Sequence, residues 1–218
     1  MTDFTFGFQT AVQIATEAVD KLVTTAASHN RIFVLEVMGR DAGWIALNAA
    51  IAGGADVCVI PEIPYDINKI KEKIESRYKK GRGFCIIVVA EGSRNARGEK
   101  VGLKADEPGY SNFKLGGIGQ TLKLELQQAG VEHDIRVSVL GHLQRGGTPI
   151  AYDRVLASEF GVKAFELAKS GEFGKMVAYK HPDIIAVTLE EALKEPHLVS
   201  PDSFLVQTAK GLGIEFGG

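Results

Sequence analysis

The sequence predicts an α/β fold in which helices cover both faces of a parallel sheet, and three observations support this. Helical and strand-like segments alternate along the 218 residues. The strand-like segments are almost continuously apolar and rich in β-branched residues, as strands buried on both faces are. Three of them are followed by polar residues with a glycine among or beside them, at 38–40, 91–92 and 142–145. Because ligands bind beyond the carboxyl ends of parallel strands, these ends predict a site at one edge of the sheet.

The first elements are predicted from apolar spacing and from glycine or proline at their ends. Residues 8–29 have apolar positions at helical intervals and predict an amphipathic helix. A strand at 32–37 follows, and an Ala-rich helix over 43–53 ends at two glycines. The next strand covers 56–60 and stops at Pro61.

The middle of the chain continues the alternation. A charged helix with one isoleucine face is predicted over 66–80, and a strand over 84–90. Residues 93–116 are polar and Gly-rich, which predicts a loop or hairpin. A helix over 117–129 and a strand over 134–140 follow.

The remaining residues are predicted to form a helix over 150–169 and two short strands within 175–187. No helix or strand is predicted for the segment after them, which contains Pro196 and Pro201. The sequence shows no internal repeat and no low-complexity linker.

Composition excludes some classes of partner. The net charge is −2 with 24% charged residues, which gives no reason to expect DNA, RNA or an acidic membrane. No apolar run approaches the ~20 residues needed to cross a bilayer. Cys58 and Cys85 each lie in an apolar run and are interpreted as small buried hydrophobes in a reducing compartment. We therefore expect a cytoplasmic protein with no nucleic-acid or membrane partner.

Arginines bracket two of the predicted strands at the same spacing, Arg31 with Arg40 and Arg136 with Arg145. A strand rises about 3.3 Å per residue, so the members of a pair should lie roughly 20–30 Å apart. No small ligand can contact both within one copy of the chain. If all four bind one anionic molecule, its site is shared between two copies.

Two residues at the strand ends are candidates for ligand contacts. Arg40 lies in a strand-to-helix turn, where a helix N-terminus favours an anion and a planar guanidinium can bind two oxygens. Gly39 would let the backbone approach the ligand. Glu91 could accept hydrogen bonds from sugar hydroxyls. The alternatives are a solvated turn arginine and a glutamate that caps a turn.

His142 has Arg145 and a glycine pair nearby, which favours anion contact over a purely structural histidine. Arg31 and Arg136 could each be an exposed loop arginine, but the repeated spacing favours a shared role. The sequence contains neither GxxxxGK[ST] nor GxGxxG, and no zinc or GxSxG signature. It therefore identifies no triphosphate cradle, metal site or catalytic base.

Several motifs together resemble the C-terminal two-thirds of 6-phosphofructokinases, from residue 2 to about residue 190. The motifs are TDFTFGFQTA, ASHNR, EVMGRDAG, AIAGGAD, VVAEG and VLGHLQRGGTPIAYDR. The stretch around Trp44 most resembles the bacterial branch that includes ATP-using and pyrophosphate-using members. The resemblance implies a three-layer, Rossmann-like phosphofructokinase fold, mainly the domain that binds fructose 6-phosphate.

The resemblance also implies a role for each candidate residue. Arg40 would line the sugar pocket with its two preceding residues, and Glu91 would hold sugar hydroxyls. The segment after the last parallel strand would bind the sugar phosphate region. Arg31 and Arg136 would reach the site of a neighbouring subunit in a homo-oligomer, a dimer or tetramer. The implied substrate-binding residues are Arg31, Met38, Gly39, Arg40, Glu91, Arg136, His142, Leu143, Gln144 and Arg145.

In the family, a T-I-D-N-D motif with the catalytic Asp, the donor-phosphate loops and the metal-binding Asp precede the part that this chain resembles. The chain is therefore expected to lack the N-terminal donor-binding part, and Asp3 does not match the catalytic position. No catalytic residue is assigned, and no ligand of Mg²⁺, ATP or pyrophosphate is identified.

By the same resemblance, residues 7–145 would form the sugar-phosphate-binding domain. Residues 146–198 would cross to the donor-binding domain, and 199–218 would return. Without sheet neighbours, residues 148–195 are expected to pack irregularly, to pair with another copy or to be poorly ordered.

The expected function is that of one part of a 6-phosphofructokinase. The whole enzyme would transfer a phosphoryl group from ATP or pyrophosphate to fructose 6-phosphate in glycolysis, giving fructose 1,6-bisphosphate. This part would bind the acceptor and make cross-subunit contacts, and alone it would be nearly inactive. The alternatives are a sugar-phosphate-binding or regulatory module without catalysis, and a doubly wound domain with no intact site.

Overall fold

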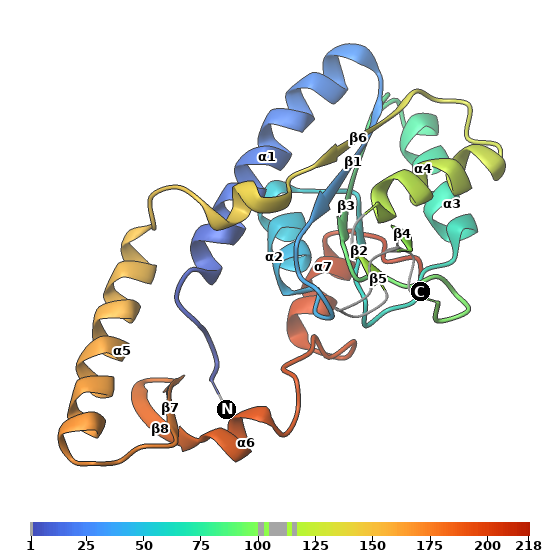
Figure 1. The fold of residues 1–218 in the computed structure, drawn as a ribbon. Helices are drawn as coiled ribbons and strands as arrows, with labels where there is room; N and C mark the ends of the chain where they lie inside the picture. Colours follow the sequence, from blue (N-terminus) through green and yellow to red (C-terminus); the bar gives the residue numbers. More distant parts are fainter. Residues whose placement is uncertain (1, 100–102, 105–112, 115–116) are drawn as a thin grey trace. The chain divides into compact units, whose positions relative to one another are not determined.

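A computed structural model describes residues 2–99, 103–104, 113–114 and 117–218 (Figure 1). The chain divides into two compact units. The sheet unit consists of Val12–Gln144 and Leu198–Gly218, and the hairpin unit of Met1–Ala11 and Arg145–His197. The binding roles predicted for residues 7–145, 146–198 and 199–218 stay predictions.

The sheet unit is built on a four-stranded parallel sheet with the order β2-β3-β1-β6. Every residue of β1, β2 and β3 is buried, which explains why the sequences of these three strands are almost continuously apolar. Ile32 pairs with Cys85 on one side and with Ile135 on the other, so the polar strand ends share one edge. The strands are β1 (Ile32–Val37), β2 (Val57–Val59), β3 (Cys85–Ala90) and β6 (Ile135–Val139).

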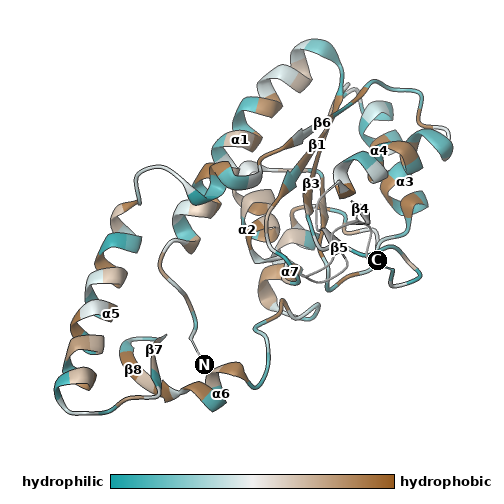
Figure 2. Cartoon of the chain, in the orientation of Figure 1, coloured by the Kyte–Doolittle hydropathy of each residue, from teal (hydrophilic) through white to brown (hydrophobic). Residues whose placement is uncertain are grey.

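Helices cover both faces of this sheet, which confirms the predicted fold class. They are α1 (Phe8–His29), α2 (Trp44–Gly53), α3 (Ile67–Lys79), α4 (Ile118–Gln128) and α7 (Phe204–Gly211). Buried residues of α1, α2 and α7 cluster with Phe33 and Leu35 of β1. Buried residues of α3 and α4 cluster with Ile32 and Val34, which point to the opposite face. In Figure 2 the apolar residues of these elements are coloured brown.

The hairpin unit contains one long helix and a two-stranded antiparallel sheet. Its elements are α5 (Ala151–Lys169), β7 (Lys175–Lys180), β8 (Asp183–Thr188) and α6 (Leu189–Leu193). The start of α1 is tied to α5 by Asp153, whose Oδ2 accepts hydrogen bonds from Thr10 N at 2.7 Å and Thr10 Oγ1 at 2.5 Å. Irregular packing of residues 148–195 was expected and is wrong, because the segment forms a regular helix and a β-hairpin. Pairing of this segment with another copy stays a prediction.

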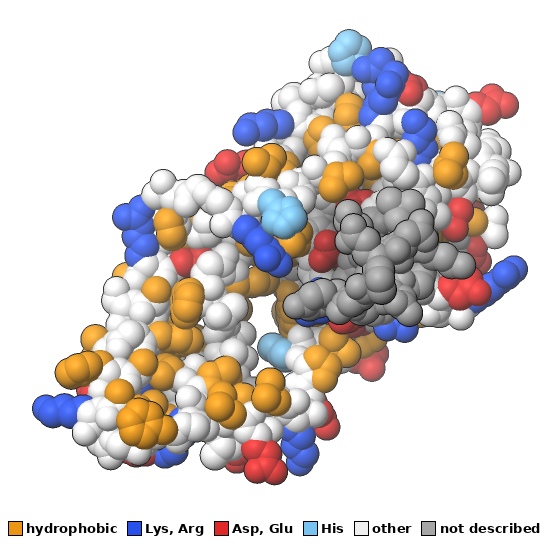
Figure 3. Space-filling view, in the orientation of Figure 1, with side chains coloured by type: hydrophobic (Ala, Val, Ile, Leu, Met, Phe, Trp, Pro, Cys, Tyr) orange, Lys and Arg blue, Asp and Glu red, His pale blue; other side chains and the backbone are white. Residues whose placement is uncertain are grey.

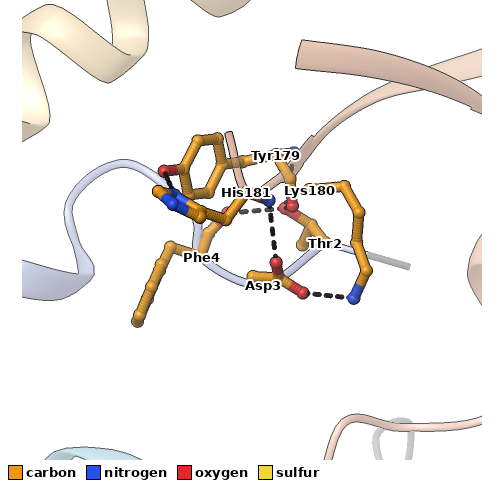
Figure 4. Close-up of polar contacts among 6 residues, drawn as sticks. All are labelled: Thr2, Asp3, Phe4, Tyr179, Lys180 and His181. Atoms are coloured by element: carbon orange, nitrogen blue, oxygen red, sulfur yellow. Dashed lines mark hydrogen bonds and ion pairs between the residues drawn. The ribbon is translucent and has the colours of Figure 1, made fainter. Parts of the chain in front are cut away.

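The first residues of the chain pair with the edge of β7 (Figure 4). Asp3 N donates to the carbonyl oxygen of Tyr179 at 2.7 Å, and Tyr179 N donates to Thr2 Oγ1 at 3.0 Å. The Asp3 carboxylate also accepts from Lys180 Nζ at 2.6 Å and from His181 N at 3.1 Å. The hydrogen bond from Lys180, followed by that from His181, holds the pKa of Asp3 below its ordinary value. Asp3 is therefore an anchor for the hairpin.

The predicted helices and strands agree with the structure to within about two residues, and three short helices were missed. Residues 93–116 contain a hairpin, β4 (Leu103–Lys104) with β5 (Phe113–Lys114), and much of that segment lies outside the described residues. The missed helices are the 3₁₀ helix η1 (Gly141–Arg145), α6 and α7. Helix α7 follows the prolines and begins at Ser203, whose Oγ accepts from Val206 N at 3.4 Å. Among the described residues, no helix is long and apolar enough to cross a membrane.

Candidate functional site

The ends of β1, β3 and β6 lie at the carboxyl edge of the sheet. The turn after β1 lies between Glu91, which follows β3, and Gln144, which lies in η1 after β6. Glu91 Oε1 accepts hydrogen bonds from Gly39 N at 3.3 Å and Arg40 N at 2.9 Å. Gln144 Oε1 accepts from Met38 N at 3.3 Å. Five predicted site residues therefore form one connected network.

The backbone of this turn explains its glycines. A Cβ on Gly39 would lie 2.4 Å from the carbonyl oxygen of Ala42, and one on Gly92 would lie 1.6 Å from that of Arg40. Arg40 itself has a φ of 54°, a left-handed conformation that costs a non-glycine residue about 1 kcal/mol. The turn is thus held tightly by its neighbours while the Arg40 side chain stays exposed. Strained residues of this kind are common where a ligand is held.

Glu91 has one oxygen left for a ligand. Both backbone donors of the turn use Oε1, and no hydrogen bond from the described residues reaches Oε2. A carboxylate oxygen of this kind can accept a hydrogen bond from a hydroxyl group. The two roles predicted for Glu91, a turn cap and a hydroxyl acceptor, are therefore compatible.

The helix N-terminus near Arg40 is not open to a bound anion, contrary to the expectation from the sequence. Glu62 occupies the N-terminus of α2, because its carboxylate accepts from Gly43 N at 3.0 Å and also from Val199 N at 2.9 Å. The nearby N–H groups of Gly39 and Arg40 are taken by Glu91. The N–H groups of Gly39, Arg40 and Gly43 are therefore already occupied and do not remain for a phosphate at this edge.

Residues of η1 differ in exposure, which separates their roles. Gln144 is 3% exposed, and its Nε2 donates to the carbonyl oxygen of Gly141 at 3.2 Å. It therefore fixes η1 against the turn after β1. His142 and Leu143 are exposed, and among the described residues no hydrogen bond joins the His142 side chain to that turn. Arg145 is exposed and begins the segment Arg145–His197 of the hairpin unit.

The opposite, amino edge of the sheet carries Arg31 and Arg136, which the structure brings together through a residue that the sequence analysis missed. Asp134 Oδ2 accepts hydrogen bonds from Arg31 Nε at 2.7 Å and from Arg136 Nε at 3.1 Å, and it forms an ion pair with Arg136 Nη2 at 3.1 Å. Desolvation acts to raise the pKa of Asp134, but the hydrogen bonds of Arg136 and Arg31 outweigh it and lower this pKa. The available signal was an acidic residue two positions before Arg136.

A second missed carboxylate is Glu36, which is buried in β1 and positions α4. Its oxygens accept from Gly117 N at 3.0 Å and Gly119 N at 2.9 Å, so a negative charge lies at the positive end of that helix. A Cβ on Gly119 would lie 2.8 Å from Val137 Cγ1, so only glycine allows this approach. A lone Glu within an apolar strand was the available signal.

The described residues include no group of three or more His, Cys, Asp and Glu side chains that could hold a metal ion. Cys58 and Cys85 are free and buried, as predicted. Burial raises the pKa of both thiols, so neither is a nucleophile at neutral pH.

Comparisons with known proteins give a consistent result. The phosphofructokinase family profile matches residues 1–168. An ATP-dependent 6-phosphofructokinase 2 of Clostridium perfringens is 52% identical over 215 residues, which cover 99% of this chain and 59% of that protein. A pyrophosphate–fructose 6-phosphate 1-phosphotransferase of Amycolatopsis methanolica is 49% identical over 204 residues, covering 93% and 59%.

Solved structures agree with the sequence comparison. The structure of phosphofructokinase from Saccharomyces cerevisiae matches with a TM-score of 0.72 and 33% identity, over 97% of this chain and 26% of that one. The chain spans about 59% of the length of each of the two relatives from Clostridium perfringens and Amycolatopsis methanolica.

Proposed function

The chain belongs to the phosphofructokinase family, and from this we propose that it forms the acceptor-binding part of an enzyme that converts fructose 6-phosphate to fructose 1,6-bisphosphate in glycolysis. The acceptor carries a phosphate and several hydroxyl groups. Guanidinium or imidazole groups can bind its phosphate, and a carboxylate can accept hydrogen bonds from its hydroxyl groups.

The connected network at the carboxyl edge carries this proposal. Glu91 fixes the turn of Gly39 and Arg40 through one oxygen and can accept a sugar hydroxyl through the other. Met38 and Arg40 line the proposed sugar pocket, and His142 and Arg145 bind the phosphate region. Gln144 contributes indirectly, because it holds η1 against the same turn.

Arg31 and Arg136 act on the acceptor of a neighbouring copy. They lie at the start of β1 and β6, whereas Arg40 follows the end of β1. Strand geometry separates the two edges by roughly 20 Å, which exceeds the reach of one sugar phosphate. The proposed assembly is therefore a homo-oligomer, a dimer or tetramer, with sites shared between copies.

Phosphoryl transfer depends mainly on positioning and on charge stabilisation of donor and acceptor. We place neither the catalytic Asp nor the groups that hold Mg²⁺ and ATP or pyrophosphate in this chain, and expect the 218-residue chain alone to be nearly inactive. Relatives named for ATP and for pyrophosphate are 52% and 49% identical, so the proposal covers both donors. Turnover by the purified chain would contradict it.

The test is a calorimetric titration of fructose 6-phosphate into the purified chain, with its mass in solution measured alongside. Binding by an oligomer that Arg136→Ala weakens at least about tenfold, as the loss of one charged contact does, would support the proposal. Arg82→Ala is the matched control, an exposed arginine before the neighbouring strand β3.

Two results would contradict parts of the proposal. A folded chain that does not bind fructose 6-phosphate would refute acceptor binding. Full-affinity binding by a monomer would refute the shared site and would favour the alternative of a sugar-phosphate-binding or regulatory module.

A further inference from the structure

The two arginines at the amino edge are held by a single carboxylate oxygen. Asp134 Oδ2 accepts from the Nε of Arg31 at 2.7 Å and from the Nε of Arg136 at 3.1 Å. It also lies 3.1 Å from Arg136 Nη2. Among the described residues, neither Nη group of Arg31 makes a hydrogen bond, and Nη1 of Arg136 makes none either. These donors remain for an external anion.

The charge of the cluster suits a phosphate. Two guanidiniums and one carboxylate carry a net charge of +1, and the carboxylate offsets the repulsion that would separate two neighbouring cations. The side chains of Arg31, Asp134 and Arg136 are 31%, 45% and 55% exposed, so the cluster faces solvent. Arg136 pairs with Phe33 in the register of β6 and β1, which fixes the backbone beneath it.

We propose that Asp134 is a positioning residue that orders Arg31 and Arg136 into one clamp for the phosphate of the acceptor bound by a neighbouring copy. The proposal rests on the proposed function, since that function supplies the phosphate. Asp134 does not touch the substrate. It reduces the rotamers open to two long side chains before binding, and so lowers the entropy that binding would otherwise lose.

The positioning role and simple electrostatics predict opposite changes in affinity when Asp134 loses its charge. Asp134→Asn removes a negative charge near the bound phosphate, so charge alone predicts tighter binding. The positioning role predicts weaker binding, because an amide oxygen is a poorer acceptor for two guanidiniums and the clamp loses its order. The substitution is at an exposed loop position before β6, so the fold does not depend on it.

The first experiment measures fructose 6-phosphate binding by calorimetry in the full chain. Asp134→Asn should weaken binding about tenfold, and Asp134→Glu, which keeps the charge, should recover part of the affinity. Asp20→Asn is the control, because it makes the same charge change at an exposed position on α1. Equal or tighter binding by Asp134→Asn would overturn the proposal.

A double-mutant cycle shows whether Asp134 acts through the arginines. In an Arg31→Ala, Arg136→Ala background, Asp134→Asn should have no further effect on the residual affinity. A further loss of similar size in that background would overturn the proposal, because it would mean that Asp134 acts by another route.

A measurement without the sugar separates this proposal from the proposed function. The Nε–Hε NMR signals of Arg31 and Arg136 are followed while inorganic phosphate is added. Both signals should shift together in the unaltered chain, and both should broaden or move towards solvent values in Asp134→Asn before phosphate is added. Independent or absent responses would overturn the clamp, whereas a joint response in a chain that does not bind fructose 6-phosphate would refute only the acceptor-binding function.

Discussion

At the scale of single residues, carboxylates organise both edges of the sheet. Glu91 holds the turn of Gly39 and Arg40 at the carboxyl edge, and Asp134 holds Arg31 and Arg136 at the amino edge. In each case a negative side chain fixes groups that are proposed to contact an anionic sugar. Each edge therefore contains a fixed geometry before any ligand binds, which lowers the cost of binding.

Glu91→Gln separates the two proposed roles of this side chain. The amide oxygen can still accept hydrogen bonds from Gly39 N and Arg40 N. The free energy of unfolding, measured by thermal denaturation, should therefore change by less than about 1 kcal/mol. The second position becomes an NH₂ donor without charge, so fructose 6-phosphate binding should weaken about tenfold or more in calorimetry. Glu17→Gln, on the exposed side of α1, is the control. Unchanged affinity would show that Glu91 is only a turn cap.

Site residues at the strand ends could be predicted from the sequence, but the residues that hydrogen-bond to them mostly could not. Arg40 and Glu91 could be found because parallel strands bring their carboxyl ends to one edge. Asp134 could not be matched with Arg31, because the two lie 103 positions apart and meet only after β6 pairs with β1. Glu62 was also missed, and with it the fact that the N-terminus of α2 already has a carboxylate.

At the scale of elements, apolar spacing predicted nearly all the long helices and strands. Their order in the sheet, β2-β3-β1-β6, was not predicted, because many strand orders satisfy the same alternation. Helix α7 was missed since two prolines precede it and only 8 residues form it. Its Val206 and Ala209 nevertheless join the core beside α2, so burial stabilises a helix too short to form alone.

Helix α3 is joined to the sheet by a buried ion pair. Arg77 Nη1 lies 2.8 Å from Asp56 Oδ1, and Ile86 N donates to Asp56 Oδ2 at 3.0 Å. Burial raises the pKa of Asp56, while the hydrogen bond from Ile86 and the charge of Arg77 act to lower it. Removing one partner of such a pair leaves an uncompensated buried charge.

Arg77→Met keeps an unbranched apolar side chain and should lower the free energy of unfolding by about 3–5 kcal/mol near neutral pH. The double variant Asp56→Asn, Arg77→Met should recover much of this loss, because neither buried side chain is then charged. Urea unfolding measures both effects. An equal loss in the double variant would mean that packing, and not the charge, is responsible.

The loss in Arg77→Met should also depend on pH. Because burial raises the pKa of Asp56 above 3.8, the folded chain keeps a proton that the unfolded chain releases. Binding of this proton stabilises the folded chain at low pH. That stabilisation is lost as the pH rises through the raised pKa of Asp56. The difference between Arg77→Met and the unaltered chain should therefore shrink as pH falls and Asp56 becomes neutral. A difference that is constant with pH would contradict this account.

At the scale of the whole molecule, the two units bury their apolar residues to different degrees. The sheet unit has strands buried on both faces, whereas the 19-residue helix α5 buries only Asp153, Leu156 and Leu167. Val155, Val162 and Phe165 on this helix are 59%, 62% and 69% exposed, and apolar side chains gather over the hairpin unit in Figure 3. The chain also spans only about 59% of its relatives' length.

An exposed apolar face of this kind should bind hydrophobic dyes and promote association. Val162→Lys with Phe165→Lys should therefore reduce both the fluorescence of bound ANS and concentration-dependent light scattering, with little change in unfolding temperature. Ser158→Lys with Glu159→Gln, at two exposed positions on the same helix, is the control, because it makes the same change in charge without altering the apolar side chains. Equal dye binding by the altered and unaltered chains would show that this face is covered in solution.

The central claim is that two copies of the chain share each acceptor site, and mixing two defective variants tests it most directly. One variant carries Arg40→Asn, since Asn tolerates the left-handed backbone there, and the other carries Arg31→Ala with Arg136→Ala. Each should bind fructose 6-phosphate far more weakly than the unaltered chain when it is alone. After mixing and exchange of subunits, random pairing into dimers should restore about a quarter of the sites, because each mixed pair has one intact site. No recovery in mixed oligomers, or full binding by either variant alone, would contradict a shared site.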